Sequence, residues 1–367
     1  MFKNIYEGKK VIVTGHTGFK GGWLSLWLKL MHADVYGISL DIPTTPSLFE
    51  VGHVSEQSIS YMEDIRDLQK MKDIFEEIKP DFVFHMAAQP IVKLAYEDPI
   101  GSMTTNVIGT LNILEALRGL KNYCVAIMIT SDKCYNNVEW IWGYKETDHL
   151  GGKDPYSASK GGAELMIKTY IHSYFNKMDN IRIASVRAGN VIGGGDWASS
   201  RIVPDSYKAW AKNEKVIIRS PDATRPWQHV LEPLSGYLRT GEFLADESKK
   251  SINGEPFNFG PSSDQSLTVL DLLEALAKNW NSTANDMLQV EPSDFHEAGL
   301  LKLNIDKALY FLGWKPALDF SETTTFTGEW YKKYYREPDA DMLAFSNQQI
   351  MDYIDAAQNK GIAWALN

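Results

Sequence analysis

The stretch Val11–Trp23, VIVTGHTGFKGGW, decides the fold that we expect for this chain. It opens with three β-branched residues, as does a strand that is buried on both faces of a sheet. Gly15, Gly18 and Gly21 then turn the chain, and apolar residues follow at helical spacing. Backbone N–H groups at the start of that helix favour an anion. The strand, turn and helix therefore predict the first half of a βαβ unit with a site for a dinucleotide pyrophosphate.

The glycines are spaced G-x-x-G-x-x-G, and by itself such a string is also compatible with an ordinary tight turn. A second hydrophobic strand over 35–40 ends at Asp41, about 20 residues after Gly21. An acidic residue at this place accepts hydrogen bonds from the adenosine ribose and repels a 2′-phosphate. We therefore expect the cofactor to be NAD rather than NADP.

Strands and amphipathic helices alternate from the first strand to Arg187. Further strands are expected over 82–85, 125–129 and 181–186, with helices over 68–78, from 106 to 117 and over 163–170. Strict alternation predicts an α/β fold with a doubly wound parallel sheet of the Rossmann type. Ligands bind at the carboxyl ends of such strands, where Gly15, Asp41, Ala87, Ser131 and Arg187 all fall.

Beyond Arg187 the alternation weakens, which indicates a second domain. We expect residues 1–188, joined by about 228–258 as a returning helix, to form the NAD-binding domain. Residues 189–227 and 259–367 then form a smaller, mixed α/β substrate domain that closes over the cofactor.

Composition excludes several classes of protein. With 44% hydrophobic and 23% charged residues, the 367-residue chain resembles a globular enzyme, and its net charge of −10 argues against a nucleic-acid partner. No signal sequence and no apolar run of membrane-spanning length is present, so we expect a cytoplasmic protein without a membrane partner. Cys124 and Cys134 cannot make a disulfide framework, and no zinc spacing predicts a metal site.

Tyr156 and Lys160 stand at i and i+4 in the segment YSASK. On a helix they share one face, and a nearby ammonium favours the phenolate that acts as a general base. Lys160 could also donate to the nicotinamide ribose. The alternative is a coincidental pair on a solvated helix.

With the glycine turn upstream and Ser131 placed 25 residues before Tyr156, the sequence resembles the extended short-chain dehydrogenase/reductase superfamily over nearly its whole length. The resemblance implies that Tyr156 is the catalytic base, Lys160 its partner and Ser131 a ligand of the substrate hydroxyl. It also implies that NAD is bound by Gly15, Thr17, Gly18, Phe19, Lys20, Gly21, Asp41, Asp64, Ile65, Ala87, Ala88, Thr130, Tyr156 and Lys160.

The segment Thr130-Ser131-Asp132-Lys133 narrows this resemblance. Sugar-nucleotide 4,6-dehydratases carry Thr/Ser-Asp-Glu here, whereas simple epimerases lack the acidic pair. Together with segments 144–160, 189–197, 201–205 and 225–238, the Asp-Lys pair is similar to the CDP-glucose 4,6-dehydratase group. That resemblance implies oxidation at C4, loss of water across C5 and C6, and hydride return to C6. The product would be CDP-4-dehydro-6-deoxyglucose, a precursor of deoxysugars of the lipopolysaccharide O-antigen type.

Two residues would carry the elimination in this scheme. Asp132 would protonate the departing water, and Lys133 would remove the C5 proton. A lysine must first lose its own proton, so burial or the Lys160 cation would have to favour the neutral amine. The alternative is that Lys133 only stabilises the enolate, with Tyr156 or water as the base.

Substrate contacts are expected from the second domain and from one loop of the first. Arg225 and Arg201 could hold a diphosphate bidentately, although a surface ion pair is the commoner role of an arginine. By resemblance, Asn190 donates to a phosphate oxygen and Gln89 also contacts the substrate. Five aromatic or imidazole side chains are better explained by the core than by base stacking or catalysis: Trp197, Trp210, Trp227, His85 and His229.

Other functions use the same machinery. A nucleotide-sugar 4-epimerase or a different 4,6-dehydratase is the first alternative, and Asp132-Lys133 argues against the epimerase. A non-catalytic NAD-sensing regulator would be expected to lose the Tyr156–Lys160 pair, which is intact. By analogy we expect a homodimer or homotetramer in which the helices near Val107 and Tyr156 pair.

Overall fold

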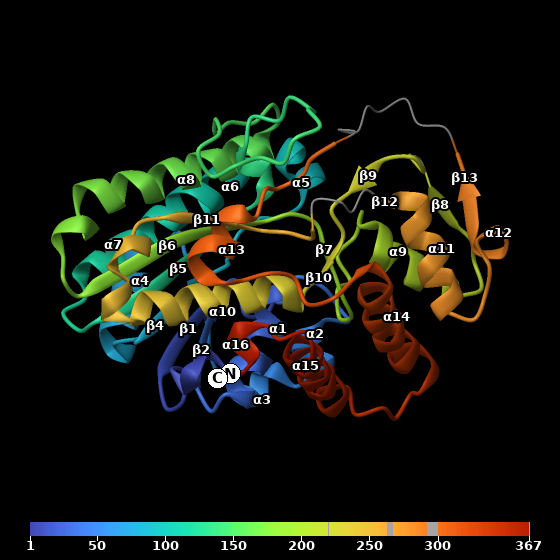
Figure 1. Cartoon of the computed structure of the whole chain (residues 1–367), viewed down its shortest axis with the longest axis horizontal. Coiled ribbons are helices and arrows are strands. Elements are labelled where there is room, and N and C mark those ends of the chain that lie inside the picture. Colours follow the sequence, from blue (N-terminus) through green and yellow to red (C-terminus); the bar gives the residue numbers. More distant parts are fainter. Residues whose placement is uncertain (219, 263–266, 292–299, 367) are drawn as a thin grey trace.

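The computed structural model describes residues 1–218, 220–262, 267–291 and 300–366. Within these residues a seven-stranded parallel sheet, in the order β11-β6-β5-β4-β1-β2-β3, forms the larger lobe on the left of Figure 1. Its strands are β1 (Lys10–Thr14), β2 (Asp34–Ser39), β3 (Ile59–Met62), β4 (Phe82–His85), β5 (Cys124–Ile129), β6 (Ile181–Ala188) and β11 (Pro256–Phe259). The expected doubly wound parallel sheet is confirmed.

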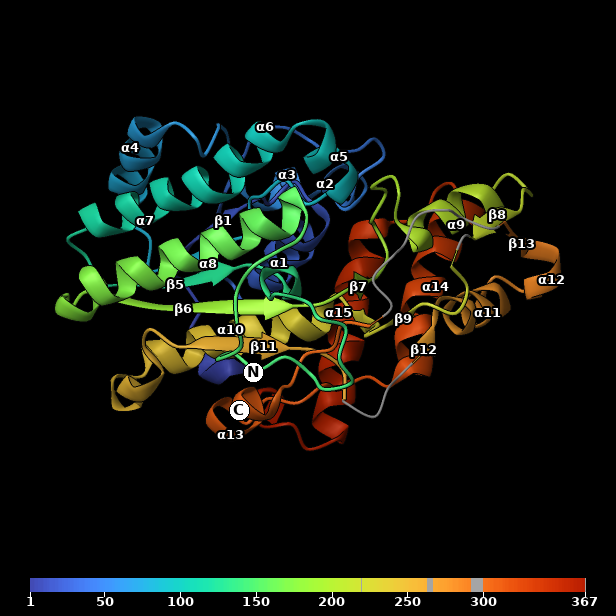
Figure 2. The same cartoon turned by 90° about the horizontal axis from the view of Figure 1, so that it is seen from above.

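Helices cover both faces of the sheet, and each face has its own core. On one face α4 (Leu68–Ile78), α7 (Thr110–Gly119) and α8 (Pro155–Ser173) pack side by side. On the other face lie α1 (Phe19–Leu30) and α10 (Leu231–Ala245), as Figure 2 shows from above. The central strands are buried along almost their whole length because helices leave neither face to solvent.

Two edge strands and one helix start differ from the sequence prediction. The prediction missed β3, which is mostly exposed, and the four-residue β11 that pairs with β6. The helix expected to open at Asn106 begins instead at Pro99, as α6 (Pro99–Met103). It continues through a π-helical turn, η2 (Thr104–Gly109), into α7. The prediction was wrong there because Asp98 caps the earlier turn, with Gly101 N–H donating to its side chain.

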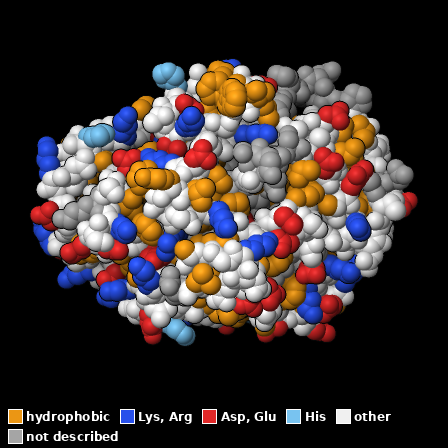
Figure 3. Space-filling model, viewed as in Figure 1, with side chains coloured by type: hydrophobic (Ala, Val, Ile, Leu, Met, Phe, Trp, Pro, Cys, Tyr) orange, Lys and Arg blue, Asp and Glu red, His pale blue; other side chains and the backbone are white. Residues whose placement is uncertain are grey.

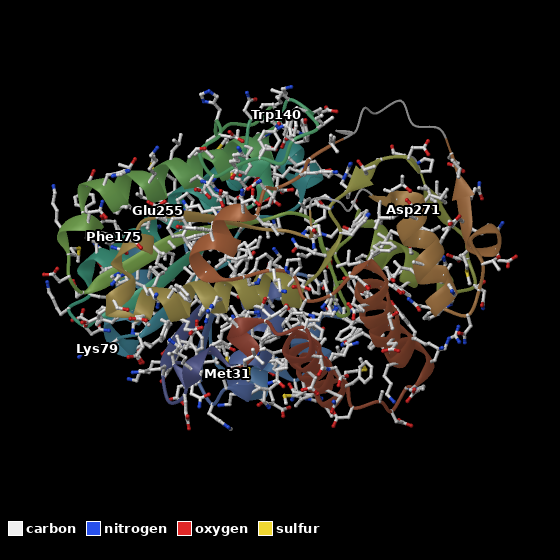
Figure 4. The ribbon with its side chains drawn as sticks, viewed as in Figure 1. Met31, Lys79, Trp140, Phe175, Glu255 and Asp271 are labelled. Carbon is white, nitrogen blue, oxygen red and sulfur yellow. The ribbon has the colours of Figure 1, made fainter. Side chains whose placement is uncertain are left out.

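Helix α10 packs on β5 and β6 and so lies against the sheet of the larger lobe. The smaller lobe contains α9 (Ile202–Trp210), α11 (Val269–Asn279), α14 (Phe320–Arg336) and short strand pairs. Those strands are β8 (Val216–Ile218), β9 (Thr224–Arg225), β12 (Leu267–Thr268) and β13 (Leu288–Val290). In Figure 4, Asp271 on α11 marks this lobe, and Lys79 and Phe175 mark the far side of the larger one.

The C-terminal helices return to the larger lobe. The chain passes through α15 (Met342–Asn359) to α16 (Ala363–Leu366), where the Trp364 ring stacks on Phe2 at 5.0 Å between centroids. Part of the range 259–367 therefore packs against the N-terminal segment rather than within the smaller lobe. The domain boundaries stay a prediction.

The remaining elements are short. They are η1 (Phe2–Asn4), α2 (Leu48–Val51), α3 (Val54–Gln57), α5 (Val92–Glu97), η3 (Asp132–Cys134), η4 (Phe175–Lys177), β7 (Val191–Ile192), β10 (Gln228–His229), η5 (Glu247–Ile252), α12 (Ala284–Met287) and α13 (Asp306–Leu312). On the face drawn in Figure 3, acidic and basic side chains are interspersed. Among the described residues, no helix has both the length and the apolar character that crossing a bilayer requires.

Candidate active site

The glycine turn brings two backbone segments into close contact. Gly15 has a φ of +78°, and a Cβ added there would lie 2.9 Å from the backbone nitrogen of Ala87. A Cβ on Gly21 would lie 2.1 Å from the Gly15 carbonyl oxygen. Gly18 precedes the first turn of α1, which no described side chain caps. The turn therefore keeps N–H groups at a helix N-terminus for an anion and has room only for glycine, as a bound pyrophosphate requires.

The end of β2 is tied to this turn. The Thr17 hydroxyl donates to the carbonyl of Asp41 at 2.7 Å, and the Asp41 side chain is exposed. His16, which the sequence analysis did not single out, is linked through its ring nitrogens to Ser39 and Ser60, both at 2.9 Å. Burial lowers the pKa of His16 to about 4, so the ring is neutral at physiological pH. These contacts place Asp41 beside the turn, where a ribose acid is expected.

Asp64 and Ile65 are already engaged within the protein. The guanidinium of Arg66 donates to the Asp64 carboxylate at 2.6 Å, and this bond holds the pKa of Asp64 below its usual range. Ile65 is buried, and its carbonyl accepts from the Asn112 amide at 3.0 Å. Their predicted cofactor contacts stay a prediction.

Strand β4 ends in a loop that is held by buried hydroxyls. Thr14 Oγ1 accepts from the backbone N–H groups of Met86 and Ala87, both at 3.0 Å. His85 bonds to Thr14 at 2.8 Å and to Thr110 at 3.0 Å, and burial lowers its pKa to about 3. These contacts are those of a histidine that holds the end of β4 in place, as a structural role predicts.

The same loop continues through half-buried Ala88 to Gln89. The Gln89 amide donates to Ser102 at 2.7 Å and accepts from Ile91 N–H at 2.5 Å. The side chain that the resemblance assigns to substrate thus shapes its own loop in this structure.

Tyr156 and Lys160 lie on the first turns of α8, whose N-terminus Asp154 caps by accepting from Ser157 N–H at 3.0 Å. The Nζ of Lys160 lies 5.9 Å from the Tyr156 ring centroid. Burial raises the pKa of Tyr156 to about 12, and a hydrogen bond with Ser131 opposes that rise. Burial lowers the pKa of Lys160 to about 8. The two side chains are therefore buried and close together.

The segment after β5 brings three further predicted residues to this pair. Ser131 Oγ donates to Asp132 Oδ1 at 2.9 Å and accepts from Lys133 N–H at 3.2 Å. Asp132 is 3% exposed, and its Oδ2 has no hydrogen-bond partner among the described residues. Burial raises the pKa of Asp132, whereas the nearby Lys133 cation lowers it. Burial favours the protonated carboxyl, which is the form that a general acid needs.

Lys20 reaches the same cluster from the glycine turn. Its Nζ lies 5.9 Å from the ring centroid of Tyr237 on α10. Burial first, and then the Arg201 cation, lower the pKa of Lys20 to about 8, while the Asp132 carboxylate opposes them. The sequence analysis placed Lys20 at the cofactor alone, since nothing in the local pattern indicates its proximity to Asp132.

A buried ion pair lies beside the site and holds the elements around it together. Arg187 on β6 and Glu164 on α8 lie 2.7 Å apart, with side chains 3% and 4% exposed. Thr130 donates to Glu164 at 2.5 Å, and Arg187 donates to Tyr135 at 2.7 Å. The ion pair therefore joins α8 to β6, and the Thr130 hydroxyl joins the end of β5 to the same carboxylate.

The predicted substrate arginines lie in different surroundings. Arg201 Nη1 is 2.8 Å from Asp196 Oδ2, and the charge of Arg201 lowers the pKa of Tyr156. The structure thus brings Arg201 close to Tyr156. Arg225 lies on β9, is half-buried and donates to the Thr224 carbonyl at 2.8 Å. Asn190 is half-buried between β6 and β7.

Four of the side chains expected in the core are buried there. Trp197, Trp210 and Trp227 are at most 5% exposed, and burial lowers the pKa of His229 to about 3. Among the described residues, no group of three or more His, Cys, Asp or Glu side chains is arranged to hold a metal ion.

Comparisons with known proteins agree with this geometry. Residues 12–327 match the family described as GDP-mannose 4,6 dehydratase. The chain is 47% identical to a CDP-glucose 4,6-dehydratase of Salmonella typhimurium, over 96% of this chain and 98% of that protein. It is 25% identical to dTDP-glucose 4,6-dehydratase 1 of Escherichia coli, over 88% and 92% of the two chains.

Solved structures share the fold. An epimerase from Methanothermobacter thermautotrophicus has a TM-score of 0.77 at 22% identity, covering 91% of this chain and 95% of that one. A dTDP-glucose 4,6-dehydratase from Bacillus anthracis, in complex with NAD, has a TM-score of 0.74 at 18% identity, covering 92% and 100%.

Proposed function

Because this chain belongs to the GDP-mannose 4,6-dehydratase family, we propose that it is an NAD-dependent CDP-glucose 4,6-dehydratase. The observation that carries the proposal is the convergence of Tyr156, Lys160, Ser131 and Asp132 at one end of the sheet, beside the glycine turn. The 47% identity to the Salmonella typhimurium enzyme supports the CDP-glucose substrate.

The glycine turn fits NAD. Gly15 and Gly21 have no room for a Cβ, and the uncapped start of α1 points N–H groups at the place of the pyrophosphate. Asp41 would accept from the adenosine ribose hydroxyls, and Lys160 would donate to the nicotinamide ribose. When bound, NAD supplies the hydride acceptor for C4 and the hydride donor for C6.

The residues of the chain supply the proton transfers. Tyr156 takes the proton of the C4 hydroxyl, and the Lys160 cation favours its phenolate. The resulting C4 ketone acidifies the C5 proton. As the C5 proton leaves, the C6–O bond breaks and Asp132 protonates the departing hydroxide, so that water is released.

We assign to Lys133 the role of the base that removes the C5 proton. Lys133 follows Asp132 in the chain and is half-buried. The Lys133 ammonium exchanges its protons with solvent, and it gives one of them to C5 as hydride reaches C6. In the second role that the sequence left open, Lys133 only stabilises the enolate.

Arg225 and Arg201 would hold the substrate diphosphate, with Asn190 donating to a phosphate oxygen and Gln89 nearby. Arg201 lies close enough to affect the pKa of Tyr156, which supports its place at the sugar end of the substrate.

Assembly and location are also proposed. Exposed apolar side chains on α6, η2 and α8 support a homodimer, or a tetramer built from dimers, through these helices. They are Ile100, Met103, Ile108 and Leu165. Both cysteines are free and buried, which suits a cytoplasmic enzyme that feeds deoxysugar synthesis for lipopolysaccharide. Light scattering coupled to size-exclusion chromatography tests the assembly.

The reaction is tested by incubating the purified protein with CDP-glucose and NAD⁺ in D₂O and recording the NMR spectrum of the product. We expect a 4-keto-6-deoxy sugar that carries deuterium at C5. UDP-, dTDP- and GDP-glucose serve as matched substrates. A C4 epimer, or turnover of another nucleotide sugar alone, would contradict the proposal.

Lys133→Ala then tests the base. If Lys133 is the base, the variant forms the 4-ketone without deuterium exchange at C5. Undiminished elimination would contradict the role of Lys133 as the base.

A further inference from the structure

The proposed reaction, on which this inference rests, leaves two side chains with unequal numbers of protons. The C4 O–H bond breaks and its proton goes to Tyr156, whereas the hydroxide that leaves C6 takes a proton from Asp132. C5 loses one proton and later gains one from the same base, and the hydride lost from C4 ends on C6, so no oxidant is consumed. Unless a proton moves between them, each turnover leaves Tyr156 with one proton too many and Asp132 with one too few.

Ser131 lies between these two groups. Its Oγ donates to Asp132 Oδ1 at 2.9 Å, and the same side chain lies close enough to the Tyr156 hydroxyl to lower the pKa of Tyr156. A serine hydroxyl can donate one hydrogen bond and accept another at the same time. Ser131 precedes η3, and Tyr156 lies in the first turn of α8, so two elements far apart in the sequence meet at this one hydroxyl.

Bulk water has poor access to both ends of this link. Asp132 is 3% exposed and Tyr156 is 8% exposed. Asp132 Oδ2 has no hydrogen-bond partner among the described residues, so this oxygen is free to face the departing hydroxyl. An internal path is therefore the short route by which the carboxyl regains its proton.

We propose that Ser131 relays the proton taken from the C4 hydroxyl, from Tyr156 to Asp132, so that this proton leaves in the water released from C6. The Tyr156 O–H bond breaks as a Ser131 O–H bond forms, and the original Ser131 O–H bond breaks as the Asp132 O–H bond forms. Asp132 gives its own proton to the hydroxide. At the end Tyr156 is again a phenolate and Asp132 again carries a proton, now on Oδ1, and the Ser131 hydroxyl and the Asp132 carboxyl rotate back before the next turnover.

The direction of the relay is set by the basicity of the final proton acceptor, the hydroxide that leaves C6. Burial raises the pKa of Tyr156 to about 12, so the phenol alone does not protonate a carboxylate readily. Hydroxide is a far stronger base, because water has a pKa of about 15.7. Breaking the C6–O bond therefore draws the proton along the chain from the phenol to the new water molecule.

Ser131→Ala interrupts the relay, and Ser131→Thr keeps a hydroxyl. In Ser131→Ala, Tyr156 and Asp132 must exchange protons with solvent after every turnover. We expect kcat to fall at least tenfold more than the rate of the first turnover, which rapid quench measures. We also expect imidazole, a small proton carrier, to raise kcat in proportion to its concentration, with no such effect in the wild type or in Ser131→Thr.

Ser157→Ala is the matched control, because the Ser157 hydroxyl donates to Asp154 and lies on the same turn as Tyr156. A structural defect would lower the first and the later turnovers together, without imidazole rescue. That result in Ser131→Ala, with wild-type protein dehydrating CDP-glucose, overturns the relay alone. Failure of the wild type to dehydrate CDP-glucose overturns the proposed function instead.

Discussion

The Nζ of Lys160 lies 5.9 Å from the centre of the Tyr156 ring, and both side chains are buried. The two residues, four apart in the sequence, form a close pair on α8 to which water has little access. Burial opposes both charges, since it raises the pKa of Tyr156 to about 12 and lowers the pKa of Lys160 to about 8. The proposed mechanism therefore requires that Lys160 stays protonated while Tyr156 loses its proton.

Removing the phenol should remove catalysis and leave the fold. Tyr156→Phe deletes the base, and we expect kcat for CDP-glucose to fall by about 10²- to 10⁴-fold. NAD affinity by calorimetry should stay within about threefold, because the ring remains. Retention of wild-type kcat would contradict the role of Tyr156.

The activity should decline as the pH rises through about 8, where Lys160 loses its proton. Above that pH the cation that favours the phenolate is gone, so kcat/KM falls. Lys160→Arg keeps its charge because a guanidinium has a pKa above about 12. We expect this variant to lose the decline, and a decline at the same pH in Lys160→Arg would exclude Lys160 as its source.

Lys20 should affect Asp132 as well as the cofactor. Its cation lowers the pKa of Asp132, so Lys20→Met should raise that pKa and keep Asp132 protonated to higher pH. The decline of the elimination rate with pH, measured by rapid quench, then moves upward in Lys20→Met and stays in place in Lys20→Arg. A change in NAD affinity alone would limit Lys20 to the cofactor.

Substitutions at two glycines distinguish the cost of backbone strain from the cost of a steric clash. Gly8 and Gly15 both have positive φ, of +66° and +78°, but an added Cβ meets nothing within 4 Å at Gly8 and the Ala87 nitrogen at 2.9 Å at Gly15. Gly8→Ala should cost about 1 kcal/mol of unfolding free energy. Gly15→Ala should cost more and should also reduce the stabilisation by added NAD in thermal unfolding. Equal effects would argue against the predicted cofactor position.

The buried pair of Arg187 and Glu164 should matter far more than a surface pair. Arg187→Met leaves the Glu164 carboxylate buried without its partner, which typically costs about 3–5 kcal/mol. Lys93 and Glu97, 3.9 Å apart with side chains 72% and 57% exposed, provide the control. Lys93→Met should cost about 0–1 kcal/mol in denaturant unfolding. Similar losses in the two variants would contradict the prediction.

The sequence alone was sufficient to predict those features that depend on residues close to one another in the chain. The run Val11–Val13 and the glycines after it specify a buried strand and a turn, because strand burial, helical spacing and positive φ are local properties. The Tyr156–Lys160 pair follows from the helical period in the same way. The parallel sheet then follows from the regular alternation of strands and helices.

Only the tertiary structure placed residues that are distant in sequence. Lys20 belongs by sequence to the cofactor turn, yet it lies close enough to Asp132 to affect its pKa. Ser131 is joined to Tyr156 because η3 and α8 pack together at the end of the sheet. Likewise β11 completes the sheet beside β6, and Trp364 returns to Phe2. Such contacts depend on the packing of the whole chain, since no local pattern records which buried surfaces meet.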